Sequence, residues 1–239
     1  MSTVEKLDRL IAVELQAGLP SAIIGRQIIV LEETDSTNDA ILEVASPQGA
    51  AVSSGAVALA KAASLPAVAS AKEGPPPLVD EGLVLFAEHQ TAGRGQRGNR
   101  WESAAGKGLW FSILLRPQIQ INDSARLTIW VMEAISDVIR AEFSLEPTIK
   151  LPNDIQVHGR KVAGVLVEMR AQEKAPHLAI VGIGINVNQS LEHFPSDLQD
   201  RAISLAMALG QHVDRQKFAA ALLQTLDETY RARFMPADF

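Results

Sequence analysis

Glycines and arginines are interleaved in the segment Gln90–Trp101, which reads QTAGRGQRGNRW. Its glycines, Gly93, Gly95 and Gly98, satisfy the G-x-G-x-x-G pattern of dinucleotide-binding loops. Such a loop opens a helix and is followed about 20 residues later by an acidic residue. Here the chain continues with polar residues, and no such acid occurs near Arg116. The sequence therefore argues against a dinucleotide-binding loop.

The same segment carries three arginines, Arg94, Arg97 and Arg100, on a backbone that the glycines make adaptable. Guanidinium groups bind phosphate oxygens through paired hydrogen bonds. We therefore expect the loop to enclose an anion, for which a phosphate-bearing ligand is the natural candidate. A solvated basic turn is the alternative interpretation.

Lysine, asparagine and aspartate are concentrated in Lys150–Asp154 (KLPND) and in the following Gly159–Gly164 (GRKVAG). An Asn-Asp pair after proline is by itself most often only a turn. Lys161 favours a functional interpretation of this cluster, because it begins an apolar strand where its stem can be partly buried and its ammonium group aimed at a fixed point. The short segment His158–Arg160 predicts a hairpin turn between two strands.

Small and branched residues alternate in Gly182–Val187, which reads GIGINV. Glycines on one face of a strand let a ligand approach the backbone closely. Asn186 offers a hydrogen-bond donor and an acceptor together, as reading an adenine edge requires.

Several kinds of catalysis are set aside by the sequence. It contains no cysteine, no G-x-S-x-G nucleophile elbow and no G-x-x-x-x-G-K-S/T phosphate loop. Its five histidines lack the spacing of metal ligands, so we expect no protein metal site. The motifs are rich in phosphate-binding groups and offer no covalent nucleophile. We therefore expect the substrate to supply the nucleophile, for example a carboxylate that attacks the α-phosphate of ATP.

The composition is that of a globular protein: 239 residues, 47% hydrophobic and 21% charged, with a formal net charge of −6. The acidic balance argues against DNA binding that rests on many phosphate contacts. The sequence has no run of about 18 apolar residues and no signal-peptide pattern. We therefore expect no membrane partner and a cytoplasmic location.

Apolar runs and helical periodicity predict an α+β fold in which helices pack against a mixed β-sheet. Strands are expected at 28–31, 83–87, 109–115, 155–157, 162–169 and 178–185. Helices are expected at 7–17, from Ser36 to Val44, in a long segment capped by Asn122 or Ser124, at 198–209 before Gly210, and at 215–233 after Asp214. Residues 46–80, rich in Ala, Ser, Val, Gly and Pro, are expected to form a flexible insertion, with an Ala-rich helix at 56–63 as the alternative.

Four motifs together make this sequence resemble the biotin protein ligases. They occur in the family's order: Thr34–Asn38 (TDSTN), Gln90–Gly95 continuing to Trp101, Lys150–Asp154 with Gly159–Gly164, and Gly182–Asn186. The resemblance covers roughly residues 28 to 234. Its G-R-K-x-A-G element favours biotin over the related lipoate ligases.

The resemblance implies the class II aminoacyl-tRNA synthetase and biotin synthetase-like fold, and a two-step reaction. Biotin and ATP with Mg²⁺ give biotinyl-5′-AMP, and the biotin is then transferred to a lysine of a biotin carboxyl carrier domain. The alternatives are a ligase for lipoate or octanoate, and a protein that binds biotin or biotinyl-AMP without transferring it.

The resemblance also assigns roles to individual residues. Biotin is expected to contact Ser36, Thr37, Gln90, Gly93, Lys161, Gly164 and Gly182. ATP is expected to contact Arg94, Arg97, Trp101, Lys161 and Asn186, with Trp101 stacking on the adenine. Lys161 and Arg94 are the expected catalytic residues, because Lys161 matches the lysine that bridges the biotin carboxylate and the α-phosphate. We add Asp154, because the acceptor amine must lose a proton before it attacks.

Three positions depart from the family pattern. Gln96 and Asn99 stand where many members have arginine, and Leu151 replaces the usual tryptophan. These departures bear on adenylate retention and acid specificity. We expect one catalytic domain over residues 1–239, without an N-terminal DNA-binding domain or a C-terminal β-domain. A homodimer is compatible with the resemblance, since sheet-edge dimers occur in the family.

Overall fold

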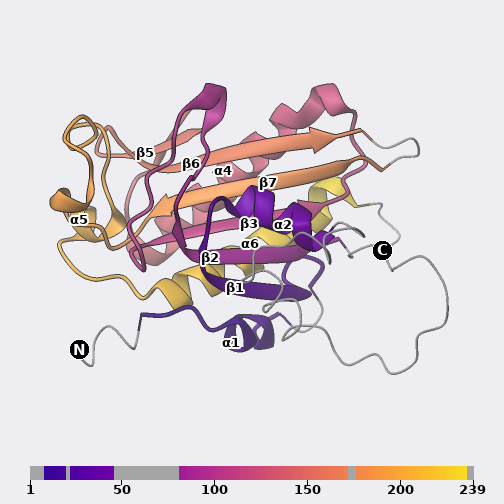
Figure 1. The fold of residues 1–239 in the computed structure, drawn as a ribbon, viewed down its shortest axis with the longest axis horizontal. Coiled ribbons are helices and arrows are strands. Elements are labelled where there is room, and N and C mark those ends of the chain that lie inside the picture. Colours follow the sequence, from indigo (N-terminus) through magenta and orange to yellow (C-terminus); the bar gives the residue numbers. More distant parts are fainter. Residues whose placement is uncertain (1–7, 20–21, 46–80, 172–175, 236–239) are drawn as a thin grey trace.

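A mixed β-sheet forms the centre of the computed structural model, which describes residues 8–19, 22–45, 81–171 and 176–235. Its strands are β1 Gln27–Thr34, β2 Leu83–Gln90, β3 Gly108–Leu115, β4 Thr148–Lys150, β5 Asp154–Val157, β6 Arg160–Arg170 and β7 Leu178–Asn186. They follow the order β1-β2-β3-β7-β6-β5-β4 (Figure 1). The pair β1 and β2 is parallel, and the other neighbouring pairs are antiparallel.

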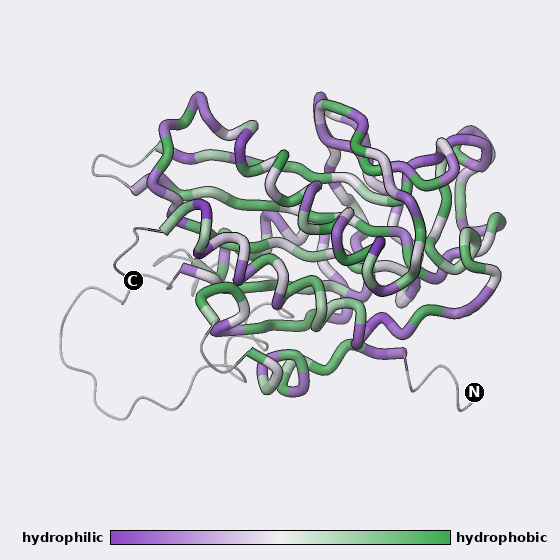
Figure 2. Tube along the Cα trace, turned by 180° about the vertical axis from the view of Figure 1, so that it is seen from behind, coloured by the Kyte–Doolittle hydropathy of each residue, from purple (hydrophilic) through white to green (hydrophobic). Residues whose placement is uncertain are grey.

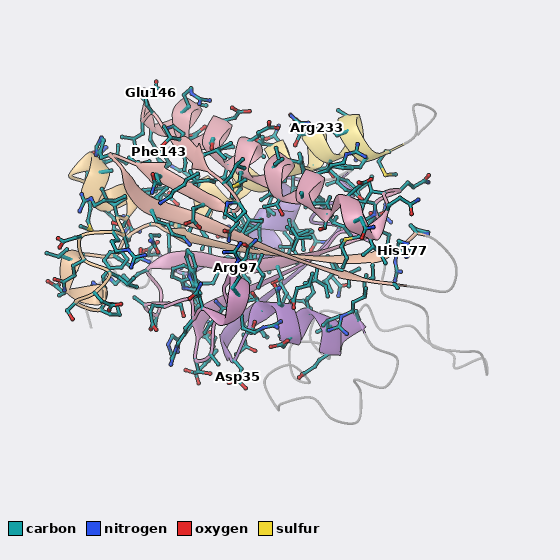
Figure 3. The ribbon with its side chains drawn as sticks, turned by 90° about the horizontal axis from the view of Figure 1, so that it is seen from above. Asp35, Arg97, Phe143, Glu146, His177 and Arg233 are labelled. Carbon is teal, nitrogen blue, oxygen red and sulfur yellow. The ribbon has the colours of Figure 1, made fainter. Side chains whose placement is uncertain are left out.

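Helices cover both faces of this sheet. They are α1 Ala12–Ala17, α2 Thr37–Ala45, α4 Ser124–Phe143, α5 Leu205–Leu209 and α6 Arg215–Phe234, with short 3-10 turns at Gln96–Gly98, Ile121–Asp123 and Leu191–His193. The long helices α4 and α6 lie along one face, and α2 lies along the other (Figure 3). In the described part of the chain, no helix is both long and apolar enough to cross a lipid bilayer.

Strand β2 shows why the central strands are apolar along their whole length. Val84 and Phe86 point into the core beneath α4 and α6, whereas Leu83 and Leu85 pack under α2. Because both faces of the strand are buried, its apolar residues form a continuous run instead of alternating with polar ones. The hydropathy colouring shows the same concentration of hydrophobic residues along the sheet (Figure 2).

A buried arginine ties the first described residues to α6. Arg215, the first residue of α6, is 1% exposed and bonds Glu88 of β2 at 2.8 Å and the Gly108 carbonyl at 2.9 Å. Its Nε donates to Asp8 Oδ1 at 3.1 Å. Glu88 Oε1 accepts in turn from the Leu10 backbone amide at 2.9 Å. This network holds Asp8 and Leu10 against the end of β2.

A second contact joins α6 to the start of β2. The Tyr230 hydroxyl donates to Glu81, whose same oxygen accepts from the Arg116 backbone amide at 2.7 Å. Burial and the neighbouring Glu81 carboxylate raise the pKa of Tyr230. The hydroxyl therefore keeps its proton and serves as a donor.

The sequence prediction of a mixed sheet packed with helices is confirmed, and all six predicted strands are present. The predicted hairpin turn is also confirmed, with His158 and Gly159 at φ of 51° and 72° between β5 and β6. Gly210 ends α5 in the left-handed conformation, and Asp214 caps α6. The predicted flexible insertion at 46–80 lies outside the described residues.

Three helix boundaries were predicted wrongly, and one strand was missed. The helix expected at 198–209 is only Leu205–Leu209, because residues 195–202 form hydrogen-bonded turns. The described part of the helix expected at 7–17 begins at Ala12. The long helix begins after Asp123, whose side chain makes no capping hydrogen bond. The short strand β4 had not been predicted.

Candidate active site

A cavity of about 150 Å³ lies on the α2 face of the sheet, beneath the loop Gly93–Trp101. Strands β6 and β7 form its floor, and the start of α2, the end of β2 and the turn between β4 and β5 form its walls. The lining residues are Ser36, Thr37, Asn38, Gln90, Arg94, Gly95, Gln96, Asn99, Arg100, Trp101, Asn153, Asp154, Lys161, Gly164, Val165, Leu166, Gly182, Ile183 and Gly184. Each of the four sequence motifs therefore contributes residues to this one cavity.

Polar groups with free hydrogen-bonding capacity line one end of the cavity. The Thr37 backbone amide donates to Gln90 Oε1 at 2.8 Å, and the Thr37 hydroxyl lies 3.1 Å from the same oxygen. Because this oxygen accepts, the amide nitrogen of Gln90 is left as a donor. Within the described residues, neither this nitrogen nor the Ser36 hydroxyl has a hydrogen-bond partner. A ligand can therefore bond to both.

Asn38 closes the cavity beside these groups. Its Nδ2 donates to Glu168 of β6 at 2.7 Å, and its Oδ1 accepts from the Ser112 hydroxyl of β3 at 2.6 Å. A side chain at Gly182 of β7 would place its Cβ 2.3 Å from Asn38 Oδ1. Gly182 is therefore required for the buried amide to reach its partners.

The Gly93–Trp101 loop folds back on itself as a short irregular hairpin. The Trp101 amide donates to the Gly93 carbonyl at 2.9 Å, and the Gly95 amide donates to the Asn99 carbonyl at 2.7 Å. Arg97 stands at its tip in the left-handed conformation, with φ of 58°. The loop leads into β3, which is antiparallel to β2, and no helix follows it directly. The sequence argument against a dinucleotide-binding loop is confirmed.

Arg94 points from this loop toward carboxylates. It makes two hydrogen bonds to Glu168, at 2.8 and 3.1 Å, and one to Asp39 at 2.9 Å. Arg97, in contrast, has no hydrogen bond or ion pair within the described residues, and it does not line the cavity. Arg100 lines the cavity and is 63% exposed, with Glu102 3.3 Å from its Nε.

Trp101 lies flat against the glycine floor. A Cβ built on Gly164 or Gly184 would stand 2.8 or 2.5 Å from its indole ring, so neither position accepts a side chain without moving the tryptophan. Lys161 Nζ lies 5.1 Å from the ring centroid, within the range of a cation–π contact. The indole nitrogen is buried and has no partner among the described residues.

Lys161 is held by its backbone as well as its side chain. Its amide donates to the Arg201 carbonyl at 2.8 Å, and its carbonyl accepts from Ile203 at 2.9 Å. Its Nζ lies 2.6 Å from Asp154 Oδ1, and the two side chains are about one third exposed. The ammonium group therefore stands at a fixed point of the cavity, paired with a carboxylate, yet open to a ligand.

Asn153 fixes the turn that carries Asp154. Its Nδ2 donates to the Val165 carbonyl at 3.0 Å, and its own carbonyl accepts from the Val165 amide at the same distance. This double contact with β6 places Asp154 opposite Gly164 in the sheet. The Asn-Asp pair is thus a turn, as its residue types suggest, and also part of the cavity wall.

Most of the predicted site residues come together in the cavity. Ser36, Thr37, Gln90, Arg94, Trp101, Asp154, Lys161, Gly164 and Gly182 line it, whereas Gly93, Arg97 and Asn186 do not. Asn186 is 4% exposed, and its amide bonds the Ile203 carbonyl at 3.2 Å and the Gln189 side chain at 3.1 Å. No group of three His, Asp or Glu side chains that could hold a metal ion occurs in the described ranges.

Sequence reasoning gave no role to several residues that build the site. Asp39 and Glu168 bind Arg94, while Ser112 and Asn153 position their neighbours through hydrogen bonds. Asp39 directly follows the TDSTN motif. It could have been proposed as a site residue from the sequence, because its place in the first turn of a helix was predicted. Glu168 had no such signal, since it lies 74 residues from Arg94.

Comparison with known proteins identifies similar sequences over this region. Residues 72–186 match the model of the biotin/lipoate A/B protein ligase family. The bifunctional ligase/repressor BirA of Bacillus spizizenii is 40% identical over 151 residues, which are 63% of this chain and 46% of that protein. The biotin--[acetyl-CoA-carboxylase] ligase of Mycobacterium tuberculosis is 31% identical over 151 residues, 62% of this chain and 53% of that protein. The chain thus spans about half the length of these curated relatives.

Solved structures with the same fold include the biotin protein ligase of Aquifex aeolicus in complex with biotin and ATP. It is 28% identical and superposes with a TM-score of 0.63 over 88% of this chain and 74% of that one. A mutant of the same Aquifex aeolicus ligase in complex with biotin gives a TM-score of 0.64 at 28% identity, over 88% and 72% of the two chains. The predicted fold, that of class II aminoacyl-tRNA synthetases and biotin synthetase, is confirmed.

Proposed function

We propose that this chain carries a biotin protein ligase catalytic domain, which activates biotin with ATP as biotinyl-5′-AMP and transfers the biotin to a lysine of a biotin carboxyl carrier domain. In the first step the biotin carboxylate attacks the α-phosphate of ATP and pyrophosphate leaves. In the second step the lysine amine attacks the mixed anhydride and AMP leaves. Most of the residues proposed to act in these steps line the cavity described above, which supports the proposal.

The polar groups at one end of the cavity are the basis for proposing biotin as the substrate acid. A ureido ring presents two N–H donors and one carbonyl acceptor, which suit the hydroxyls of Ser36 and Thr37 and the free amide nitrogen of Gln90. The dithiolane ring of lipoate has no N–H group and no carbonyl oxygen, so it would leave the Ser36 hydroxyl and the Gln90 amide nitrogen without partners, whereas the Thr37 hydroxyl keeps its contacts with Gln90 and Ser112. Each buried polar group left unpaired costs about 1–3 kcal/mol, so we propose biotin as the preferred acid.

Lys161 is the proposed catalytic cation of the first step. A carboxylate is already ionised at neutral pH, so the step needs charge neutralisation and alignment more than a base. The ammonium group is proposed to contact the biotin carboxylate and the α-phosphate together, because Lys161 lines the same cavity as Ser36 and its Nζ lies 5.1 Å from the Trp101 ring at the end of the arginine loop. Gly164 and Gly182 line the cavity floor, where the absence of a side chain makes space for Trp101 and Asn38.

The nucleotide is proposed to lie under the Gly93–Trp101 loop. Trp101 offers a ring for the adenine and an unpaired indole nitrogen, and Arg97 offers a cation without an internal partner in the described region. Asn186 would have to exchange its bonds to Ile203 and Gln189 before it could read the adenine edge.

Mg²⁺ is proposed to enter with ATP. This ion binds mainly through substrate phosphates and water, with one or two protein carboxylates. Asp154 is the carboxylate that lines the cavity, so it fits the protein part of such a shell. The bound ion would offset phosphate charge.

Three further expectations stay predictions: a cytoplasmic location, a single catalytic domain and a homodimer.

Replacing Asp154 with asparagine is expected to slow transfer more than adenylation. The acceptor lysine is protonated at neutral pH, and a carboxylate beside the anhydride can orient it and take its proton. Loss of a general base costs roughly 100-fold or more, so single-turnover transfer from preformed biotinyl-AMP should fall by about that factor. The assay follows biotin on a carrier domain. Unchanged transfer would remove Asp154 from this role.

The proposed function is tested by biotin-dependent exchange of labelled pyrophosphate into ATP, followed by transfer to a carrier domain. We expect exchange with biotin, and exchange at least about 100-fold slower with lipoate or octanoate, because two or more polar groups would stay unpaired. Exchange with lipoate alone would move the protein to the lipoate ligases. Biotin binding without exchange or transfer would make it a binding protein.

A further inference from the structure

We propose that Glu168, assisted by Asp39, is a positioning residue that holds Arg94 and thereby fixes the Gly93–Trp101 loop over the acid-binding end of the cavity. This inference rests on the proposed function. Arg94 donates to both oxygens of Glu168, at 2.8 and 3.1 Å, and such paired hydrogen bonds are among the stronger guanidinium–carboxylate contacts. Asp39 accepts from the same guanidinium at 2.9 Å. Arg94 thus joins the loop to β6 and α2.

Glu168 also bonds a residue of the cavity wall, Asn38. Glu168 Oε2, which accepts from Arg94, also accepts from Asn38 Nδ2 at 2.7 Å. Asn38 accepts from Ser112 at 2.6 Å and occupies the space beside Gly182. Asn38 directly follows Thr37, which binds Gln90. Hydrogen bonds from the loop to Asn38, and the peptide link from Asn38 to Thr37, therefore connect the loop to the groups that we propose bind the ureido ring.

The charges argue for positioning rather than phosphate binding by Arg94. One guanidinium faces two carboxylates, so the cluster of Arg94, Asp39 and Glu168 carries a net charge of 1 − 2 = −1. Such a cluster does not attract a polyphosphate. Lys161 is the better candidate for binding the phosphates, and Arg97 is another, because it has no internal partner among the described residues. The role that the sequence gave Arg94, in the phosphate loop, becomes that of a loop anchor.

Glu168→Gln is the variant that separates these roles, because it keeps the side-chain shape and removes the charge. We expect the Kd and KM for biotin to rise roughly tenfold, the effect of losing one charge-assisted contact. The KM for ATP and the kcat of pyrophosphate exchange should stay within about twofold. The pair is partly exposed, at 39% and 28%, so salt should weaken the wild-type contact as well.

A matched control removes a charge of the same kind on the other face of the sheet. Glu133→Gln breaks an exposed pair with Arg233, which lies on the α4 and α6 side (Figure 3). It should leave biotin binding unchanged. Thermal unfolding of both variants reports any general loss of stability. The double variant Arg94→Gln with Glu168→Gln should bind biotin no more weakly than Arg94→Gln alone, because removing Arg94 already breaks its contacts with Glu168 and Asp39.

The outcomes are distinct. Biotin constants unchanged in Glu168→Gln would overturn the inference while leaving the proposed function intact. A lower KM for ATP would also overturn it, since Arg94 would then be a phosphate ligand that Glu168 restrains. Additive losses in the double variant would show that the residues act separately. A wild-type chain that binds no biotin in calorimetry would overturn the proposed function, and this inference with it.

Discussion

Replacing Lys161 with alanine is expected to lower biotin-dependent pyrophosphate exchange by roughly 1000-fold, the loss seen when a preorganised charge-stabilising group is removed. The ammonium group lies 2.6 Å from Asp154 and beside the ring of Trp101. Removing it leaves the Asp154 carboxylate without its counter-ion in the cavity that must receive a second carboxylate and a triphosphate. The variant therefore loses charge neutralisation and gains repulsion between Asp154 and the negatively charged substrates. Both effects lower activity, so we expect a lower kcat and higher KM values for biotin and for ATP.

The fold should survive this change. The backbone of residue 161 is held by hydrogen bonds to Arg201 and Ile203, which alanine retains. Lys217→Ala is a suitable control, because that lysine is 85% exposed on α6 and its side chain pairs only with Asp214 among the residues that the structure describes. Circular dichroism should show both variants folded, and the control should exchange at the wild-type rate. Exchange by Lys161→Ala within tenfold of wild type would exclude Lys161 as the catalytic cation.

The parts of the fold that the sequence predicts are those set by local chemistry. Strands buried on both faces produce long apolar runs, which is why β3 and β7 were found within one residue of their ends. The turn at His158 and Gly159 was found because the short polar segment His158–Arg160 lies between two apolar runs. Gly210 ended a helix because only glycine readily adopts the left-handed conformation there.

The parts that were missed depend on tertiary contacts or on weak local signals. Strand β4 has three residues, all exposed, and lies at the edge of the sheet, so no apolar run marks it. Apolar residues before Leu205 suggested a longer helix, but turns position residues 201–203 against Lys161 instead. The same limit applies to the site: sequence identified the guanidinium of Arg94, but Glu168, which faces it from 74 residues further along the sequence, could be located only in the folded chain.

Replacing Arg215 with methionine is expected to lower the free energy of unfolding by about 3–5 kcal/mol, the range for removing one partner of a buried ion pair. Arg215 is 1% exposed and Glu88 8% exposed. Without the guanidinium, the Glu88 carboxylate stays buried with the Leu10 amide as a partner but without a countercharge, and the Gly108 carbonyl loses its donor. Methionine fills most of the arginine's volume, so the effect reports charge and hydrogen bonds more than a cavity.

Two comparisons isolate that cause. Arg233→Met removes an exposed pair with Glu133, in which the side chains are 47% and 41% exposed, and should cost no more than about 1 kcal/mol. Adding Glu88→Gln to Arg215→Met should recover part of the loss, because it removes the isolated charge and keeps an acceptor for Leu10. Urea unfolding followed by fluorescence measures all four proteins. If Arg215→Met costs no more than Arg233→Met, water or chain movement must relieve the Glu88 charge, and the network is not what anchors Asp8 and Leu10 to α6.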